Sequence, residues 1–217
     1  MLFRSPPLAS ELYGCHKLEA ENIVRASGLE WSILRIAGVI TLEPLVDYGD
    51  FDSFYLGALM PEDNRCHTVD SRDVAAAFLA AVSTDAVGEI FMIAGDDSHK
   101  RLQGEVAYAS AESMGLGALL FPGRPGDPDS DSDWFPEDWL DTTRSQQVLS
   151  FQRYSSAQAY DEIRAKIGWK IRPLRAAAPT VAALMRRKGP YYKQPGQYAD
   201  PWGRIRDRWG DPGPDVS

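Results

Sequence analysis

Residues 11–40 join a helix-forming segment to an apolar, β-branched run, and this unit limits the folds that the chain can adopt. The segment 11–27 carries apolar residues at helical spacing among good helix formers, and Gly28 follows at the position of a helix stop. The run 31–40 predicts a mostly buried strand that leads into a loop near Gly38. A helix that returns into a buried strand is typical of a parallel sheet.

The rest of the chain continues the alternation of strands and helices. Strands are predicted over 66–69 and 89–93. Helices are predicted over 54–60, 72–82, 102–114, 142–149, a segment capped by Ser155 or Ser156, and 174–187. The alternation predicts an α/β architecture, with few strands for a sheet covered on both faces.

Composition and charge narrow the classes of function. The 217 residues are 44% hydrophobic and 25% charged, which is enough for a folded core, and the net charge is −8. That charge argues against binding nucleic acid or an anionic membrane surface, and it fits a protein that handles a small-molecule substrate. The two cysteines form neither a disulfide framework nor a metal cluster, so we expect no metal site. No apolar run is long enough to span a membrane, and we expect a cytoplasmic location.

Tyr13 and Lys17 are the candidate catalytic residues. A tyrosine and a lysine four positions apart lie on one face of a helix. An ammonium beside a phenol stabilises the phenolate, so such a tyrosine can exchange a proton with a substrate oxygen while a nicotinamide exchanges hydride. On its own the pair also fits an ordinary surface helix, and the segments that follow decide between the two interpretations.

Four later features accompany this pair in a specific order. The segments are Tyr-Gly-Cys-His-Lys-Leu-Glu-Ala-Glu at 13–21, Leu-Arg-Ile-Ala-Gly-Val at 34–39, His-Thr-Val-Asp-Ser-Arg-Asp-Val-Ala at 67–75, Gly-Glu-Ile-Phe-Met-Ile-Ala-Gly at 88–95, and Asp-Thr-Thr-Arg at 141–144. In this order they resemble the extended short-chain dehydrogenase/reductase superfamily, which comprises NAD-dependent epimerases, dehydratases and related reductases. The resemblance departs at His16, where the family usually has serine, and at Ile36, where it usually has proline.

The resemblance implies a fold, a cofactor and residue roles. It implies the remnant of a Rossmann-type parallel sheet plus a small mixed α/β substrate-binding region, with NAD or NADP as the cofactor of the complete protein. Tyr13 would be the catalytic acid/base, and Lys17 would assist it and hold the cofactor ribose. The implied cofactor-binding residues are Tyr13, Lys17, Ile36, Ala37, Gly38 and Val39.

The family's glycine-rich phosphate loop has no counterpart in this sequence. That loop binds the cofactor pyrophosphate through backbone N–H groups at a helix N-terminus. We therefore expect a C-terminal portion of the family fold that lacks the N-terminal dinucleotide-binding half and is inactive as given. We also hypothesise that residues 1–5 are a non-native leader, because a common sequencing-adapter end encodes Leu-Phe-Arg-Ser in one frame.

The expected organisation has three parts after this leader. Residues 6–40 would be the C-terminal part of the Rossmann domain, with the catalytic helix and the strand after it. Residues 41–188 would be the substrate-binding region with returning Rossmann elements. Residues 189–217 are predicted to be a weakly ordered tail, or an arm that docks by its aromatic residues.

Three alternatives stay open at this point. His67 and Asp70 could be catalytic, although we favour a structural role in which Asp70 or Asp73 caps a helix or bridges to a neighbouring loop. The chain could also be a non-catalytic binding or interaction module that kept the C-terminal half of the fold. Finally, unpaired edges of a parallel sheet predict that the chain aggregates or pairs with a second copy, as a homodimer.

Overall fold

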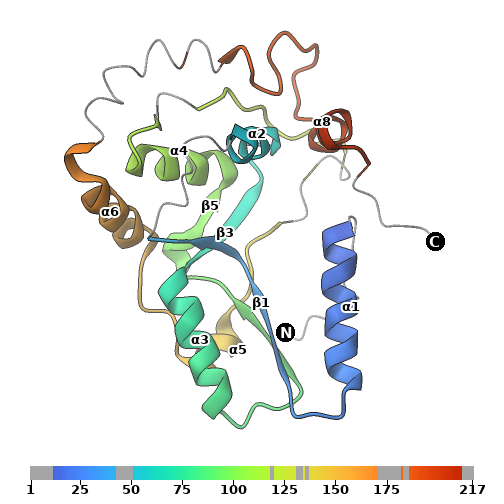
Figure 1. Cartoon of the computed structure of the whole chain (residues 1–217), viewed down its shortest axis with the longest axis vertical. Helices are drawn as coiled ribbons and strands as arrows, with labels where there is room; N and C mark the ends of the chain where they lie inside the picture. The colour runs from blue at the N-terminus through green and yellow to red at the C-terminus, as the bar shows by residue number, and fades with distance from the viewer. Residues whose placement is uncertain are drawn as a thin grey trace.

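The computed structural model describes residues 12–42, 51–117, 120–130, 134, 137–170, 182 and 186–211. The strands lie centrally, with helices on either side of them (Figure 1), which confirms the predicted α/β class. The helices are α1 (Leu12–Ala26), α2 (Phe51–Leu59), α3 (Ser71–Ser83), α4 (Gln103–Ser113), α5 (Thr143–Leu149), α6 (Ser156–Ile167) and α8 (Pro201–Trp209), with 3-10 turns η1 (Asp97–His99) and η4 (Gly168–Lys170). The strands are β1 (Ser32–Ile36), β2 (Gly38–Ile40), β3 (Arg65–Asp70), β4 (Glu89–Ile93) and β5 (Lys100–Leu102).

The strands form two small sheets. In the first sheet β1 and β4 are parallel, in register from Ser32 opposite Glu89 to Ile36 opposite Ile93. In the second sheet β2 is parallel to β3, and β3 is antiparallel to β5. The first sheet is therefore of the parallel kind that the sequence predicted, and the second is mixed.

The strand predicted within 31–40 is present as β1, where it is half-buried rather than mostly buried, but the loop expected near Gly38 is a second strand, β2. The change from β1 to β2 occurs at Ala37, whose N–H donates to the carbonyl of Ile93, the last residue of β4, at 2.9 Å. Beyond that point β4 offers no further partner, and Gly38 pairs with Thr68 of β3 instead. This segment consequently belongs to both sheets and connects them.

Helix α1 ends where the sequence predicted. Gly28 adopts a left-handed conformation with φ +73°, which a residue with a side chain rarely takes. The chain then reverses, so β1 runs antiparallel to α1 and beside it (Figure 1). As a result, the N-terminal end of α1 lies at the same end of the molecule as the carboxyl end of β1.

Two clusters of buried side chains hold the elements together. The first lies among β4, α3 and α5 and consists of Val69, Ala77, Ala86, Phe91, Ile93, Leu149 and Phe151. The second lies between β2 and α6 and consists of Ile40, Ala159, Tyr160, Ile163 and Ile167. Tyr160, Ile163 and Ile167 thus form one face of α6 that is buried in the second cluster.

Two elements were missed by the sequence interpretation. Strand β5 has only three residues and exists because it pairs with β3, a contact that short sequence patterns do not encode. Helix α8 begins at Pro201 after the N-cap Asp200, whose carboxylate accepts from the N–H of Gly203. The predicted helix over 174–187 lies mostly outside the described residues, as do residues 1–11.

Residues 189–211, called the arm below, contact the rest of the described chain through aromatic side chains. The Tyr191 hydroxyl donates to the carbonyl of Leu59 at 2.6 Å. Trp209 meets the ring of Tyr55 edge-on, with ring centres 5.8 Å apart. The aromatic contacts therefore match the second alternative, an arm that docks by its aromatic residues. Within the described chain, no helix has the length and apolarity needed to cross a membrane.

Candidate functional site

Tyr13 and Lys17 lie side by side in the first two turns of α1. The Lys17 Nζ is 5.2 Å from the centre of the Tyr13 ring, and Tyr13 is 66% exposed. Both side chains belong to the end of α1 that lies level with the carboxyl end of β1 (Figure 1). In open α/β sheets, ligands bind in the crevice outside the carboxyl ends of the strands. The predicted pair is thus accessible at the end of the sheet where a ligand is expected.

A two-pronged ion pair holds α1 against β1. The Nε and Nη2 atoms of Arg35 each donate to a Glu21 carboxylate oxygen at 2.8 Å, and Arg25 reaches the same carboxylate at 3.3 Å. The hydrogen bonds from Arg35 hold the pKa of Glu21 below its usual range. No described side chain of α1 is fully buried, so this ion pair is a main determinant of where the helix lies.

The four residues predicted to contact the nicotinamide divide into two groups. Ile36 ends β1 and is 41% exposed, and Ala37 is the residue at which the chain changes sheets. Gly38 and Val39 begin β2 and line a large cavity. The described lining of the cavity does not include Tyr13, Ile36 or Ala37. Of the four predicted residues, only Gly38 and Val39 contact the cavity directly.

The cavity has a volume of about 780 Å³, within the size range of small-molecule sites. Its walls come from β2, β3, α2, α4, α6 and the segment 120–123. Most of the lining side chains are aliphatic, aromatic or glycine. The region predicted to bind substrate therefore contains a cavity that begins at the predicted cofactor residues.

Cys66 and Glu137 form a polar pair on this cavity, and the sequence interpretation missed it. Burial, followed by the nearby Glu137 carboxylate, raises the pKa of the Cys66 thiol to about 12. Although Glu137 is exposed as a residue, the cavity wall shields its carboxyl, and this partial desolvation raises the pKa of Glu137. Cys66 is consequently a neutral thiol near pH 7 and not a ready nucleophile. No local motif joins two residues so far apart in sequence.

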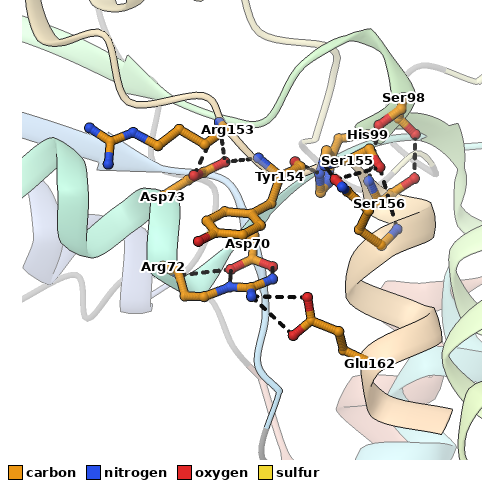
Figure 2. Close-up of polar contacts among 11 residues, drawn as sticks. Asp70, Arg72, Asp73, Ser98, His99, Arg153, Tyr154, Ser155, Ser156 and Glu162 are labelled. Atoms are coloured by element: carbon orange, nitrogen blue, oxygen red, sulfur yellow. Dashed lines mark hydrogen bonds and ion pairs between the residues drawn. The ribbon is translucent and has the colours of Figure 1, made fainter. Parts of the chain in front are cut away.

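Asp70 and Arg72 form the centre of a buried polar network (Figure 2). Asp70 is fully buried, caps α3 by accepting from the N–H of Arg72 at 2.8 Å, and also accepts from the Arg72 guanidinium at 2.9 and 2.8 Å. The same guanidinium reaches both carboxylate oxygens of Glu162 at 3.0 Å and stacks on the ring of Tyr154 at 3.5 Å. The network therefore joins α3 to α6.

Asp73 and His67 also have structural partners. The Asp73 carboxylate accepts from the N–H groups of Arg153 and Tyr154 at 3.1–3.3 Å, as Figure 2 shows. His67 Nδ1 accepts from the N–H of Leu140 at 3.0 Å, so Nε2 carries the proton that faces the carbonyl of Gly95 at 3.1 Å. Burial lowers the pKa of His67 and favours this neutral form. These contacts support the structural interpretation over a catalytic one.

Across the part of the chain that the structure describes, His, Cys, Asp and Glu side chains do not form a group of three or more that could hold a metal ion.

Neither a family model nor a curated protein matches this chain. Solved structures do match it. UDP-N-acetylglucosamine 4-epimerase from Bacillus cereus is 20% identical with a TM-score of 0.52, over 77% of this chain and 57% of that one. The enzyme WbmG from Bordetella bronchiseptica, solved in complex with NAD and UDP, is 19% identical with a TM-score of 0.55, over 77% and 54%. A short-chain dehydrogenase/reductase superfamily protein from Agrobacterium tumefaciens, with bound NAD, is 21% identical with a TM-score of 0.55, over 82% and 62%.

These similarities establish the fold. The α/β arrangement of this chain is that found in these structures, one of which is named as a short-chain dehydrogenase/reductase superfamily protein, and it agrees with the fold class expected from the sequence. The chain spans between 54% and 62% of the length of these three structures. At about 20% identity, the activity and the substrate have to be argued from this chain's own residues.

Proposed function

We propose that this chain carries the acid/base pair and the substrate cavity of a nicotinamide-dependent oxidoreductase or epimerase/dehydratase. The observation that carries the proposal is the adjacency of Tyr13 and Lys17 near the N-terminus of α1, the end of the helix that lies level with the carboxyl end of β1. The strand continues through Ala37 into Gly38 and Val39, which line the cavity. One continuous segment thus links the proposed catalytic end of the sheet to the proposed substrate site.

The roles follow from the chemistry of the side chains. Tyr13 passes a proton to or from a substrate oxygen through its exposed hydroxyl. Lys17 places its ammonium 5.2 Å from the centre of the Tyr13 ring, and its N–H groups donate to ribose hydroxyls. Backbone groups of Gly38 and Val39 orient the reacting ring at the cavity. The bound cofactor supplies hydride transfer.

The hydrogen-bond donors of Tyr13 and Lys17 fit only the nicotinamide end of a dinucleotide. A tyrosine hydroxyl and a lysine ammonium suit the ribose and nicotinamide, where hydroxyl and amide groups need partners. A pyrophosphate is usually held by a glycine-rich turn at a helix N-terminus, and the sequence contains no such turn. The proposal therefore assigns the phosphate contacts to groups other than those described in this chain.

Tyr13→Phe, made in a form of the protein that turns over substrate, tests the acid/base role. Turnover is expected to fall by at least about 100-fold, because the proton donor is removed, while nucleotide affinity stays within about twofold. Steady-state kinetics and calorimetric titration measure the two quantities. Tyr192→Phe, at an exposed tyrosine of the arm, is the matched control. Unchanged turnover in Tyr13→Phe would refute the acid/base role of Tyr13, whereas a wild type without turnover would favour the alternative of a non-catalytic binding module.

Titration of the chain as given with NAD(H) and NADP(H) tests whether the phosphate contacts depend on groups other than those described in this chain. We expect no binding tighter than about 1 mM, since the phosphates contribute much of the affinity and find no cradle here. Isothermal calorimetry or a thermal-shift series measures this. Micromolar affinity would show that the residues of this chain are enough to bind the nucleotide, and it would overturn the assignment of the phosphate contacts to other groups.

A further inference from the structure

The large cavity carries an inference about the class of substrate, and it rests on the proposed function, which makes this cavity the substrate site. Most of its walls offer only apolar side chains, such as Val39, Met60, Ala107, Met114, Phe121 and Ile163. Hydrophobic lining with few polar groups favours ligands whose surface is mainly apolar. The charged and polar groups that are present decide which ligands are excluded.

The ionisable groups around the cavity are acidic. Glu62 and Glu137 line it, and its described lining includes no lysine, arginine or histidine. Sites for phosphate or pyrophosphate groups usually place arginine or lysine against the oxygens. Here a diphosphate would meet two carboxyl groups and no positive charge on the described walls.

A helix N-terminus could in principle replace a cationic side chain, and α4 begins at the cavity wall with Gln103 and Gly104. Its first N–H groups are already occupied. The N–H of Gln103 donates to the carbonyl of Asn64 at 2.8 Å, and that of Gly104 to the carbonyl of Glu62 at 2.8 Å. The Glu105 carboxylate accepts from the N–H of Leu102 at 3.0 Å. An anion at the N-terminus of α4 would therefore have to displace the hydrogen bonds of the first two helical N–H groups.

The polar side chains deeper in the wall also have partners within the protein. Tyr160 and Ser110 are joined through their hydroxyl groups at 3.5 Å, and the Ser113 hydroxyl donates to the carbonyl of Ser110 at 2.7 Å. Thr68 is hydrogen-bonded to His99 Nδ1 at 2.8 Å. A ligand in the cavity would therefore meet hydroxyl groups that already have a hydrogen-bond partner in the protein. The Cys66 thiol, with a pKa of about 12, adds no charge to the wall.

We infer that this cavity binds an uncharged, mainly apolar hydroxyl or carbonyl compound and excludes nucleoside diphosphates. The apolar lining, the two acidic residues, the occupied N-terminus of α4 and the paired hydroxyls all lead to this class. The inference separates this chain from structural neighbours whose names specify UDP-linked substrates, although the fold is shared.

Two probes distinguish the substrate classes on the chain as given. Progesterone is a rigid, neutral diketone, and UDP-glucose carries a diphosphate. We expect progesterone to bind at least about tenfold more tightly than UDP-glucose, as measured by isothermal calorimetry without nicotinamide nucleotide. No progesterone binding, or UDP-glucose binding of equal or greater affinity, overturns the inference.

Gly57→Phe locates the binding. Gly57 lines the cavity in α2, and a Cβ added there meets no atom within 4 Å, so the new ring has space to enter without disturbing the fold. We expect progesterone affinity to fall by at least about tenfold. Ala75→Phe, on the exposed face of α3, is the matched control and should leave the affinity unchanged.

Ala107→Trp, from α4, fills the cavity from another wall and is the second variant. Retention of progesterone affinity in both cavity variants, with their thermal unfolding intact, overturns the inference because the ligand then binds elsewhere. Neither turnover nor cofactor enters this experiment. Failure of the Tyr13→Phe test would thus refute the proposed chemistry and leave only the class of ligand that the cavity binds. Failure of the progesterone test would refute that ligand class and leave the role of Tyr13 standing.

Discussion

Asp70 is a fully buried carboxylate whose charge is balanced within the protein. Burial by itself raises the pKa of a carboxyl group, but the side-chain and backbone hydrogen bonds from Arg72 outweigh it and lower the pKa of Asp70 from its ordinary value of 3.8. The sequence motif that placed this residue before a helix predicted the cap. It did not predict the ion pair, which depends on a guanidinium that also contacts Glu162 on α6.

Asp70→Asn should destabilise the protein by about 2–3 kcal/mol, because it removes a charge-assisted pair and leaves the Arg72 guanidinium with weaker partners. The midpoint of urea unfolding at pH 7 measures the loss. Glu162→Gln is the matched control: its carboxylate is partly exposed, and its loss should cost less than about 1 kcal/mol. Equal costs for the two variants would contradict the assignment of Asp70 as the central partner.

The same variant has a defined pH dependence. The folded pKa of Asp70 lies below that of the unfolded chain, so its stabilisation is complete above about pH 3.8 and is lost as the pH falls through the folded value. The stability difference between wild type and Asp70→Asn should therefore be constant from pH 5 to 7 and narrow below about pH 4. A difference that grows on acidification would refute this.

At the scale of single elements, α1 bears both proposed catalytic residues although the rest of the described protein buries little of it. Its described side chains are exposed or half-buried, and Glu21 joins it to Arg35 on β1. The helix itself was predicted well from the spacing of apolar residues and from Gly28. The attachment of α1 to β1 was not predicted, because the ion pair joins residues 14 positions apart and forms only where the chain reverses between the two elements.

Glu21→Gln should loosen α1 without unfolding the rest of the molecule. The loss of a two-pronged pair is expected to cost about 1 kcal/mol locally, and amide hydrogen exchange over 12–26 should accelerate several-fold while that of α3 stays unchanged. Glu19→Gln, at an exposed position of the same helix, is the control and should exchange like wild type. Acceleration of equal size in both variants would rule out the ion pair as the anchor.

Across the whole molecule, Arg124 ties the C-terminal arm to the cavity wall. Its guanidinium donates to the carbonyl groups of Gln194 and Pro195 at 2.8 and 3.2 Å and lies over the ring of Tyr191 at 4.5 Å. Its own carbonyl accepts from the N–H of Glu62 at 2.9 Å. Since the adjacent segment 120–123 lines the cavity, the arm supports the proposed substrate site from outside. The homodimer expected from the sequence stays a prediction.

Arg124→Gln should release this arm. Loss of the charged hydrogen bonds and of the stacking on Tyr191 should raise amide exchange over 189–211 at least about tenfold and lower global stability by about 1–2 kcal/mol. Exchange mass spectrometry and urea unfolding measure the two effects. Arg187→Gln removes the same charge from an exposed position and should change neither. An arm that keeps wild-type protection in Arg124→Gln would show that Arg124 does not hold it.

The sequence by itself determined the helices with strong periodicity, the strand over 89–93, the stop at Gly28 and the α/β class. Each of these depends on local propensity and on the alternation of buried and exposed positions, which are encoded within a few residues. The order of motifs also placed Tyr13 and Lys17 on one helix face. The tertiary structure bears out their adjacency.

Only the tertiary structure decided the division of β1 from β2, the pairing of β5, the docking of the arm and the apolar cavity with Cys66 and Glu137. These features depend on contacts between residues that are distant in sequence. For example, Ala37 leaves the first sheet because β4 ends at Ile93, a fact about another strand. Local sequence patterns do not indicate which distant residues will be in contact. The class of substrate can therefore be inferred only from the cavity walls, which the tertiary structure brings together.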